Sequence, residues 1–411
     1  MNYYIVTFGC QMNQSDSERI SAVLESIGYK ITDKIERANL VVINMCSVRQ
    51  SAVDRVFGLS EKLKDMKGKR TILTGCVQKR DKRKFAELFD YIVDIKDIVN
   101  LPKILKKKPV AKKDYLKIVP NYLSSFSAII PIMTGCNNFC SYCVVPSIRG
   151  REVSRPAEEI ICEIKNLINR DYKEIWLLGQ NVNSYKDGAI SFPKLLRMID
   201  NIPGKFWIRF TSSHPKDFSD ELITAMAKGK KISPYLNLPV QAGDDKILKQ
   251  MNRPYTVAQY KNAIKKVRKA IPDIALSTDI IVGFPGETKK QFSNSAKLFK
   301  EIKYDMAYIS EYSHRSGTSA SKMKDTVDKK EKKSRKEVLN EILKKTGLEN
   351  NKKFLGKEVE VLIDRKKPGI ILGKSWHYKT VKIDSKKDLV GKFVQVKITK
   401  ALSWGLEGDL I

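Results

Sequence analysis

The chain has 411 residues, of which 42% are hydrophobic and 30% charged, so it can bury real cores and is not a disordered protein. With 77 Lys and Arg against 46 Asp and Glu, its formal net charge is +31. This excess favours a polyanionic partner, above all nucleic acid, although a lysine-rich solvated surface accounts for much of it. No apolar run reaches the roughly 18 residues of a membrane span, and the opening residues do not resemble a signal peptide. We therefore expect two or three domains, no membrane partner and a cytoplasmic location.

Residues 1–107 alternate predicted strands and helices. Apolar strands are expected at 3–8, 39–45, 70–75 and 91–95. We expect a first helix near Ser15, with Ser15 and Glu18 spaced as a capping box, and a second helix that runs to about Lys67. Continuous apolar strands separated by helices predict an open parallel α/β domain.

Three cysteines, Cys10, Cys46 and Cys76, each follow one of these predicted strands. The carboxyl ends of parallel strands share one edge of a sheet, so the three thiols can meet there. In a reducing cytosol, clustered thiols indicate metal or redox chemistry rather than disulfides. The alternative is three separate buried cysteines, since free Cys is commonly buried.

Residues 108–127 are basic and interrupted by Pro, which is typical of a linker. Residues 128–352 return to an α/β pattern, with strands expected at 128–133, 174–179, 206–212, 235–240, 274–284 and 305–312. Six strand–helix units predict a partial (β/α)6 barrel with its chemistry at the carboxyl ends of the strands. We expect Cys162 to pack in the core from the first helix of this domain. The charged run at 328–345 predicts a solvated helix.

Residues 353–411 predict a small all-β barrel, with short strands at 357–364, 369–374, 378–383 and 392–398. Its stretch "GKSWHYKTVK" interleaves aromatic and basic side chains, a composition suited to RNA bases and phosphates. The alternative is that Trp376 and Tyr378 fill the core of the barrel.

A loop with the spacing C-x3-C-x2-C places Cys136, Cys140 and Cys143 directly after the first barrel strand. Zinc prefers four ligands, and the loop has no fourth Cys or His nearby. A 4Fe-4S cube with three protein thiolates keeps an open position on one iron, and S-adenosylmethionine is a cofactor that suits such a position. Alternatives are a zinc site completed by a distant His214 or His314, and a cluster that only transfers electrons.

The stretch "GCNNFCSYCVVPSIRGREVSRP" resembles the signature of the radical-SAM methylthiotransferases. The resemblance covers essentially the whole chain. It includes "GCQMNQSDSE" and "NMCSVRQSA" in the first domain, and "LLGQNVNSY", "IRFTSSHP", "LPVQAGDDKILKQMNRPYT" and "STDIIVGFPGE" in the barrel. The last module is similar to a TRAM domain, an RNA-binding β-barrel. "GCQMN" and "LLGQNVNSY" are most similar to the branch of the family that acts on prenylated adenosine in tRNA.

The resemblance implies a role for each of these residues. Cys136, Cys140 and Cys143 would form the catalytic site, holding the 4Fe-4S cluster that binds S-adenosylmethionine. Cys10, Cys46 and Cys76 would hold an auxiliary 4Fe-4S cluster that carries the sulfur to be inserted. The residues implied around S-adenosylmethionine are Tyr142, Gly179, Gln180, Ser212, Gln241, Arg253 and Val282, for which plain barrel packing is the alternative.

The implied activity is methylthiolation of C2 of N(6)-dimethylallyladenosine next to the tRNA anticodon. We expect a monomer that takes electrons from a donor such as a flavodoxin or a ferredoxin. One alternative is the same chemistry on N(6)-threonylcarbamoyladenosine or on a ribosomal protein. Another is a non-catalytic iron–sulfur RNA-binding protein, although a plain electron carrier gains nothing from open irons.

Three positions depart from the usual family pattern. Asn237 stands where the family commonly has His, and Ala242 stands where it has Ser, in "NLPVQAGDDK". Ser316 lies in "HRSGTSAS", where "RPGTPA" is common. The first two bear on cofactor contacts and the third on substrate fit.

Overall fold

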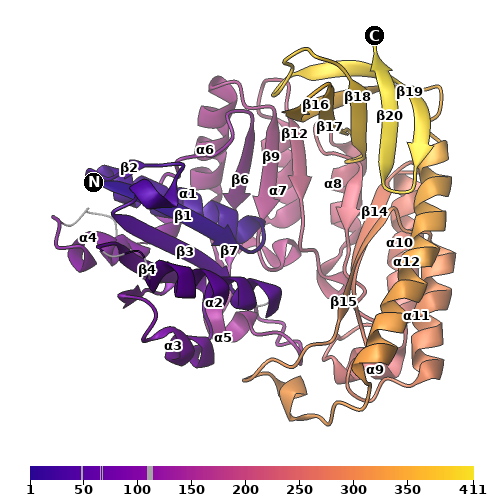
Figure 1. The fold of residues 1–411 in the computed structure, drawn as a ribbon. Helices are drawn as coiled ribbons and strands as arrows, with labels where there is room; N and C mark the ends of the chain where they lie inside the picture. The colour runs from indigo at the N-terminus through magenta and orange to yellow at the C-terminus, as the bar shows by residue number, and fades with distance from the viewer. Residues whose placement is uncertain (48–49, 65, 67, 109–113) are drawn as a thin grey trace.

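The computed structural model describes residues 1–47, 50–64, 66, 68–108 and 114–411, which form an N-terminal sheet domain, a central partial barrel and a C-terminal β-barrel (Figure 1). The predicted end of the second helix at Lys67, and residues 109–113 of the predicted linker, lie outside the described residues. The mixed α/β fold class predicted from the sequence is confirmed.

The N-terminal sheet is parallel and has five strands in the order β2-β1-β3-β4-β5. The strands are β1 (Asn2–Phe8), β2 (Lys30–Ile31), β3 (Leu40–Cys46), β4 (Arg70–Cys76) and β5 (Tyr91–Ile92), and the helices are α1 (Gln11–Ser26), α2 (Gln50–Lys64), α3 (Lys79–Phe85) and α4 (Leu101–Ile104). Successive residues of β3 face opposite sides of the sheet. Leu40 and Val42 accordingly pack in one core with α1, while Val41 and Ile43 pack in another with α2.

Helix α1 begins at Gln11 with Cys10 as its N-cap, so the predicted capping box at Ser15 and Glu18 is wrong. The cause is Asn13, whose side-chain oxygen accepts a bond from the backbone N–H of Cys10 and starts the helix one turn earlier. Glu18 is instead buried inside the helix, where its carboxylate accepts a bond from the backbone N–H of Leu123 at 3.1 Å.

Part of the stretch predicted as a linker packs on the N-terminal domain. Residues Tyr115–Lys117 form a short 3-10 helix, and the buried side chains of Tyr115, Leu116 and Ile118 join the core beneath α1. The connection between the two α/β domains is therefore ordered over these residues.

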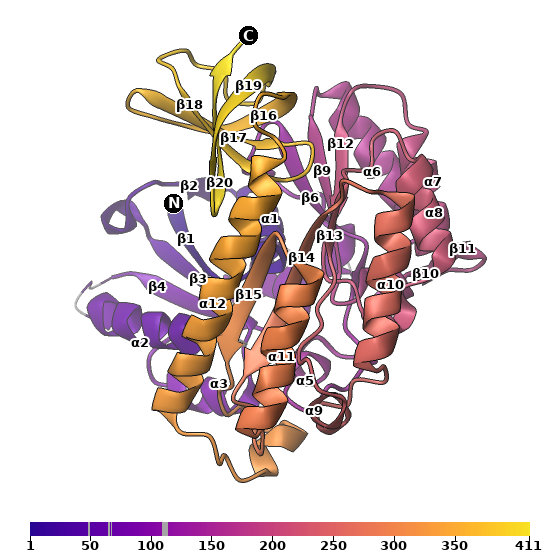
Figure 2. The same ribbon diagram turned by 90° about the vertical axis from the view of Figure 1, so that its right-hand side faces the viewer.

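The central domain holds six parallel strands in two groups, β12-β9-β6 and β13-β14-β15, which a single bridge between Ile208 and Ile232 joins. The strands are β6 (Ser127–Pro131), β9 (Glu174–Leu178), β12 (Trp207–Phe210), β13 (Tyr235–Asn237), β14 (Ala275–Val282) and β15 (Met306–Glu311). A helix follows each strand: α6 (Ala157–Asn169), α7 (Phe192–Asp200), α8 (Asp220–Lys228), α10 (Val257–Ala270), α11 (Lys289–Ile302) and α12 (Lys329–Lys352). These helices cover the outside of the strands (Figure 2), as predicted for a partial (β/α)6 barrel.

Two predictions about the barrel helices are corrected. Cys162 is exposed, because α6 buries Ala157, Ile160 and Ile164 on a face from which position 162 points away. The charged helix α12 is solvated only in part, since Arg335 is buried and pairs with Glu287 at 2.7 Å. No helix in the described part of the chain is both long and apolar enough to cross a membrane.

The C-terminal domain is a closed barrel in the order β16-β17-β18-β20-β19. Its strands are β16 (Glu358–Lys367), β17 (Ile370–Ser375), β18 (Thr380–Asp384), β19 (Phe393–Leu402) and β20 (Gly405–Leu410). The sequence patterns missed β20, whose Gly-rich and acidic residues are poor strand formers. This strand closes the barrel by pairing with both β18 and β19.

Trp376 and Tyr378 do not fill the core of this barrel, contrary to the alternative considered for them. They pack against the central domain instead. The ring of Trp376 lies 5.3 Å from that of Trp207, and the ring of Tyr378 lies 4.9 Å from that of Trp176. The fully buried Arg209 of β12 donates to the backbone oxygens of Ser375 and Trp376 and thereby fixes the two domains together.

Candidate functional site

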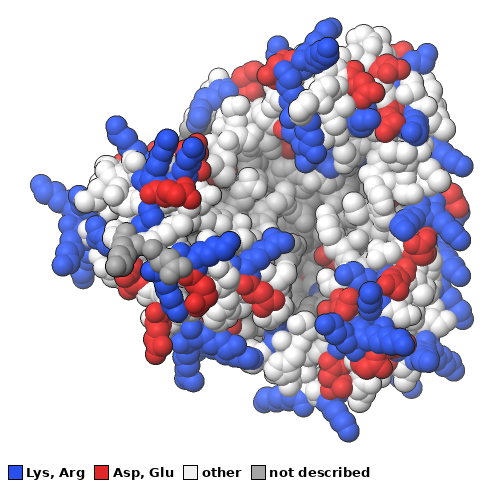
Figure 3. All heavy atoms as spheres, in the orientation of Figure 1, with Lys and Arg blue, Asp and Glu red and all other residues white. Residues whose placement is uncertain are grey.

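A cavity of about 690 Å³ lies where the three domains meet. Its walls come from the carboxyl ends of the strands in both α/β domains, together with Tyr378 of the C-terminal barrel. Figure 3 shows this face of the molecule hollowed between the N-terminal domain on the left and the other two domains, with Lys and Arg side chains on both sides of the hollow. Five of the six cysteines predicted as cluster ligands line the cavity: Cys10, Cys46, Cys136, Cys140 and Cys143.

The sixth, Cys76, lies beside Cys46 on the neighbouring strand. The two residues end the neighbouring strands β3 and β4 and are paired in register. The ends of β3 and β4 pack this closely because residue 75 is glycine. Its backbone has a φ of +97°, and a Cβ there would lie 2.2 Å from the side-chain oxygen of Asn44. Asn44 in turn accepts a bond from Asn13 of the "GCQMN" stretch at 2.9 Å, which ties the turn after β1 to the end of β3.

Arg149 joins the N-terminal cysteines to the central domain. It ends the short helix α5 (Val145–Arg149), which directly follows the three-cysteine loop, and it is 2% exposed. Its Nη2 pairs with Asp16 at 2.6 Å and its Nε donates to Cys76 Sγ at 3.2 Å. The positive charge therefore stabilises a thiolate at Cys76.

The three-cysteine loop is held between the two-residue strands β7 (Met133–Thr134) and β8 (Val153–Ser154). At Gly135, with a φ of +81°, a Cβ would lie 2.0 Å from the backbone oxygen of Arg151, so only glycine fits. The backbone N–H of Cys136 donates to the oxygen of Gly150 at 3.1 Å and closes the loop. On its other side, Arg253 donates to Cys140 Sγ at 3.4 Å and to the backbone oxygen of Pro239 at 3.0 Å.

Burial raises the pKa of both Cys76 and Cys143 to about 12. Arg149 acts in the opposite direction on Cys76, and Arg253 does so more weakly on Cys143. Thiols in such surroundings lose their protons when a metal binds them. No three His, Cys, Asp or Glu side chains in the described ranges converge as they would on a single ion, but a cube takes each thiolate at its own corner.

Six of the seven residues predicted around S-adenosylmethionine line the cavity: Tyr142, Gly179, Gln180, Ser212, Gln241 and Arg253. Val282 does not, because it is fully buried in the hydrophobic core. Side chains alternate along a strand, and Asp279, at the opposite parity of β14, is the residue that faces the cavity. That alternation could have been used to choose Asp279 from the sequence.

The lining near the three-cysteine loop is polar and suits a polar cofactor. Gln180 Oε1, Ser213 Oγ and His214 Nε2 are buried and have no hydrogen-bond partner among the described residues. Burial and the nearby Arg253 lower the pKa of His214 to about 2, so its ring is neutral. Its Nδ1 accepts a bond from the backbone N–H of Lys216, which leaves Nε2 for a ligand.

The three departures from the family pattern lie in different surroundings. Asn237 lines the cavity and donates to Asp279 and to Ser277, both at 3.1 Å. Ala242 is buried in the barrel core. Ser316 contacts the N-terminal domain, because its hydroxyl accepts a bond from Arg80 at 2.7 Å.

Aromatic side chains form a further part of the lining that the motifs did not indicate. They are Trp176, Tyr235, Tyr308 and Tyr378, which come from β9, β13, β15 and the loop between β17 and β18. Three of these aromatics belong to predicted strands, where the sequence pattern does not show which face of the barrel they occupy.

Comparisons with known proteins agree with this architecture. Residues 2–95 match the uncharacterized protein family UPF0004, residues 130–299 the radical SAM superfamily and residues 352–411 the TRAM domain. Among solved structures, the radical S-adenosylmethionine methyltransferase TsrM from Kitasatospora setae has a TM-score of 0.55 at 13% identity, covering 75% of this chain and 72% of its own. The cobalamin-dependent radical enzyme OxsB has a TM-score of 0.54 at 11% identity, covering 83% of this chain and 55% of its own. The fold and the site define a radical SAM enzyme, a class that implies a 4Fe-4S cluster and S-adenosylmethionine.

Sequence relatives narrow the assignment. A protein from Dictyoglomus thermophilum is 41% identical over 433 aligned positions, covering 100% of this chain and 98% of the relative. One from Clostridium novyi is 42% identical and covers 100% and 96%. Both are named tRNA-2-methylthio-N(6)-dimethylallyladenosine synthase. The chain belongs to this family of tRNA methylthiotransferases.

Proposed function

We propose that this enzyme attaches a methylthio group to C2 of N(6)-dimethylallyladenosine next to the anticodon of tRNA. The main support is the cavity itself, since cysteines of two separate triplets, one in each α/β domain, line a single space. Relatives of 41% and 42% identity over the whole chain, which carry the name of this activity, support the choice of substrate.

In this proposal, Cys136, Cys140 and Cys143 hold the 4Fe-4S cluster that binds S-adenosylmethionine, and Cys10, Cys46 and Cys76 hold an auxiliary 4Fe-4S cluster. When bound, the first supplies the radical chemistry that removes hydrogen from an unactivated aromatic carbon, and the second supplies the sulfur. The cofactor is positioned by the six lining residues predicted for it, Tyr142, Gly179, Gln180, Ser212, Gln241 and Arg253. Val282 acts only through barrel packing.

The protein's own groups contribute orientation and control of charge. Arg253 fixes the Cys140 side of the loop, and it donates to the backbone oxygen of Pro239, which follows β13, so the loop keeps its place relative to the barrel. His214 stays neutral, and because its Nδ1 accepts a bond from the backbone of Lys216, its Nε2 carries the proton and offers a donor without adding charge beside Arg253.

We further propose the division into domains at residues 1–107, 108–127, 128–352 and 353–411. The C-terminal barrel contacts the tRNA, a flavodoxin or ferredoxin delivers electrons, and the enzyme acts as a monomer in the cytoplasm, where its tRNA is found. The basic excess supports the RNA partner.

The test is anaerobic reconstitution with iron and sulfide, reaction with S-adenosylmethionine and dithionite as the electron donor, and mass spectrometry of the products from three substrates. Prenylated tRNA should gain a methylthio group. Modification of threonylcarbamoylated tRNA or of a ribosomal protein instead would reassign the substrate. Cluster formation without 5′-deoxyadenosine from any substrate would support the non-catalytic alternative.

A further inference from the structure

The aromatic part of the cavity wall is a compact, built feature. The ring of Tyr378 lies 4.9 Å from that of Trp176 and 4.7 Å from that of Tyr235, and the rings of Trp176 and Tyr235 lie 6.5 Å apart. Tyr308 of the last barrel strand lines the same space and is 49% exposed. Three rings in mutual contact, at interplanar angles of 48° to 76°, form one aromatic wall of the cavity and not a stack.

Tyr378 is the residue that distinguishes this wall, because it comes from the C-terminal barrel and not from the central domain. Its backbone is in the left-handed region, with a φ of +61°, which a residue with a bulky side chain rarely adopts. Such a conformation persists only where the surroundings enforce it, and it concentrates at functional sites. Ser212 and Gln241, with φ of +66° and +68°, line the same cavity.

Contacts behind the rings hold them in place. The guanidinium of Arg209 lies 4.9 Å from the Tyr378 ring centre, is bound by Glu174 at 2.7 Å and donates to the backbone oxygens of Ser375 and Trp376. The indole N–H of Trp176 also donates to Glu174, at 2.9 Å. The rings are therefore preorganised before a ligand arrives.

The charges near the rings discriminate between possible ligands. Of the described residues that line the cavity, Arg253 is the one Lys or Arg, and it is bound at the cysteine loop. Asp279 lines the cavity and accepts a bond from Asn237. Asn237 also donates to Ser277, which is hydrogen-bonded to the hydroxyl of Tyr235. A carboxylate placed among the rings would meet the negative charge of Asp279 and no cation of the lining.

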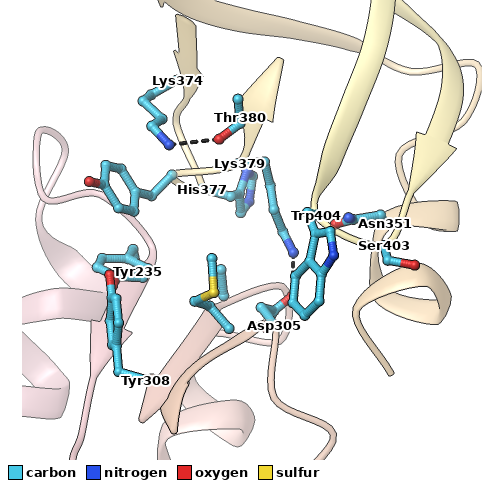
Figure 4. A pocket seen from close by; sticks show the side chains of 13 residues that line it. Tyr235, Asp305, Tyr308, Asn351, Lys374, His377, Lys379, Thr380, Ser403 and Trp404 are labelled. Atoms are coloured by element: carbon cyan, nitrogen blue, oxygen red, sulfur yellow. Dashed lines mark hydrogen bonds and ion pairs between the residues drawn. The ribbon is translucent and has the colours of Figure 1, made fainter. Parts of the chain in front are cut away.

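A smaller cavity of about 120 Å³ continues beyond these rings and shares Tyr235, Tyr308 and Tyr378 with the larger one. Figure 4 shows Tyr235 and Tyr308 on one side of it and Trp404 on the other. Lys374 lies there, 4.7 Å from the centre of the Tyr378 ring, and donates to Thr380 at 2.7 Å. Lys379 is already paired with Asp305. Among the described residues that line the two cavities, Lys374 is therefore a cation close to the Tyr378 ring, and it belongs to the smaller cavity and not to the main one.

We infer that Trp176, Tyr235 and Tyr378 form a subsite for the apolar N6 substituent of the target adenine, and that Tyr378 makes the C-terminal barrel a part of this substrate pocket. The inference rests on the proposed function and adds the basis of its selectivity. A dimethylallyl group is uncharged and branched, so it gains from contact with this aromatic wall, whereas a threonylcarbamoyl group brings a carboxylate to the side of Asp279.

The experiment measures binding of three anticodon stem-loop RNAs to the full chain by fluorescence anisotropy. The RNAs are identical except for adenosine, N(6)-dimethylallyladenosine or N(6)-threonylcarbamoyladenosine at the target position. Burial of one CH2 group is worth roughly a factor of four in affinity, so the native protein should prefer the prenylated RNA by at least about tenfold. Tyr378→Ala should lose about tenfold in affinity for that RNA alone, and Tyr378→Phe should keep the native preference.

Trp376→Ala provides the matched control. Trp376 lies in the same loop as Tyr378, but it packs on Trp207 and does not line the cavity. It should weaken domain docking without changing the preference among the three RNAs. If Tyr378→Ala keeps the native preference, or if Trp376→Ala loses it equally, the subsite is overturned while the proposed function stands. A native protein that shows no preference overturns the subsite alone, and one that prefers the threonylcarbamoyl RNA overturns both.

Discussion

The two cysteine triplets bring three thiols together by different routes. Cys136, Cys140 and Cys143 lie in one loop of eight residues, and their spacing alone keeps them close. Cys10, Cys46 and Cys76 come from the ends of three strands, and only the order β1-β3-β4 in the sheet makes them neighbours. The loop triplet is thus a local property of the sequence, whereas the strand triplet is a property of the fold.

Among the described residues, each triplet receives a bond from an arginine, Arg149 at Cys76 and Arg253 at Cys140, and these arginines also differ. Arg253 lines the cavity and is otherwise bound to neutral groups, the hydroxyl of Tyr255 and the backbone oxygen of Pro239. Arg149 lies outside the lining and is paired with the buried Asp16. Arg149 belongs to the segment that follows the loop triplet, yet its thiol partner, Cys76, belongs to the strand triplet. It is therefore a direct structural connection between the two.

The largest effect should follow from replacing Cys136, Cys140 and Cys143 with Ala. If the triplets bind clusters independently, about four iron atoms per chain should remain, because the strand triplet keeps its ligands. No 5′-deoxyadenosine should form, since the site that binds S-adenosylmethionine is lost. Iron analysis and chromatography of one reconstituted sample measure both quantities. Loss of all the iron would mean a single shared site.

Replacing Cys10, Cys46 and Cys76 with Ala should separate sulfur insertion from radical formation. The loop triplet keeps its ligands, so reductive cleavage of S-adenosylmethionine should persist, while no methylthio product should form on prenylated tRNA. Both readouts are taken from one sample, by chromatography and by mass spectrometry of nucleosides. Methylthiolated product from this variant would contradict the assignment of the strand triplet as the sulfur-carrying site.

The contrast between local and fold-dependent features also explains what the sequence could predict. The parallel domain, the six barrel units and the loop triplet follow from strand periodicity and spacing, and they are present in the structure. Arg149 could not be paired with Cys76 in advance, because the contact depends on how two domains dock. Tyr378 was likewise assigned to RNA contact or to a barrel core, since neither periodicity nor composition indicates that a loop enters another domain's cavity.

A smaller effect is expected from Arg149→Met. The substitution leaves the buried Asp16 without its ionic partner, and breaking such a pair costs about 3–5 kcal/mol. Thermal unfolding of the apoprotein should register this loss, and Asp16→Asn in the same chain should recover part of it. After reconstitution, the electron paramagnetic resonance signal of the strand-triplet cluster should change, while that of the loop-triplet cluster should not.

Arg155→Met is the matched control for that experiment. Arg155 is also buried and is paired with Glu163 at 2.7 Å. Within the described residues, its guanidinium donates to Pro131 and to no cysteine. It should lower the stability of the chain without changing either spectroscopic signal. Equal spectra for the Arg149 variant and the native protein would show that Arg149 serves only to dock the domains.

The smallest effect should come from exposed lysines of the C-terminal barrel, which provide a baseline for the comparison because they belong to a different domain from either triplet. Deleting the barrel after Asn351 is a poor test, since Asn351 itself donates to Leu402 at 2.7 Å and Arg209 would lose its two carbonyl acceptors. Point variants avoid this damage.

Lys386 and Lys387 are exposed in the turn between β18 and β19, so replacing both with Ala should leave the fold and both clusters intact. If they bind phosphates, tRNA affinity should fall, and the slope of log affinity against log salt should decrease by about 0.7 to 0.9 for each phosphate that the variant no longer neutralises. Titrations at several salt concentrations measure this slope.

The control replaces Lys289 and Lys290, which are exposed at the start of α11 on the outside of the central domain. Because removing any two charges weakens long-range attraction, only a slope that changes more in the barrel variant than in this control assigns direct phosphate binding to Lys386 and Lys387. Equal slopes would instead mean that the net charge of +31, spread over the whole surface, attracts the tRNA.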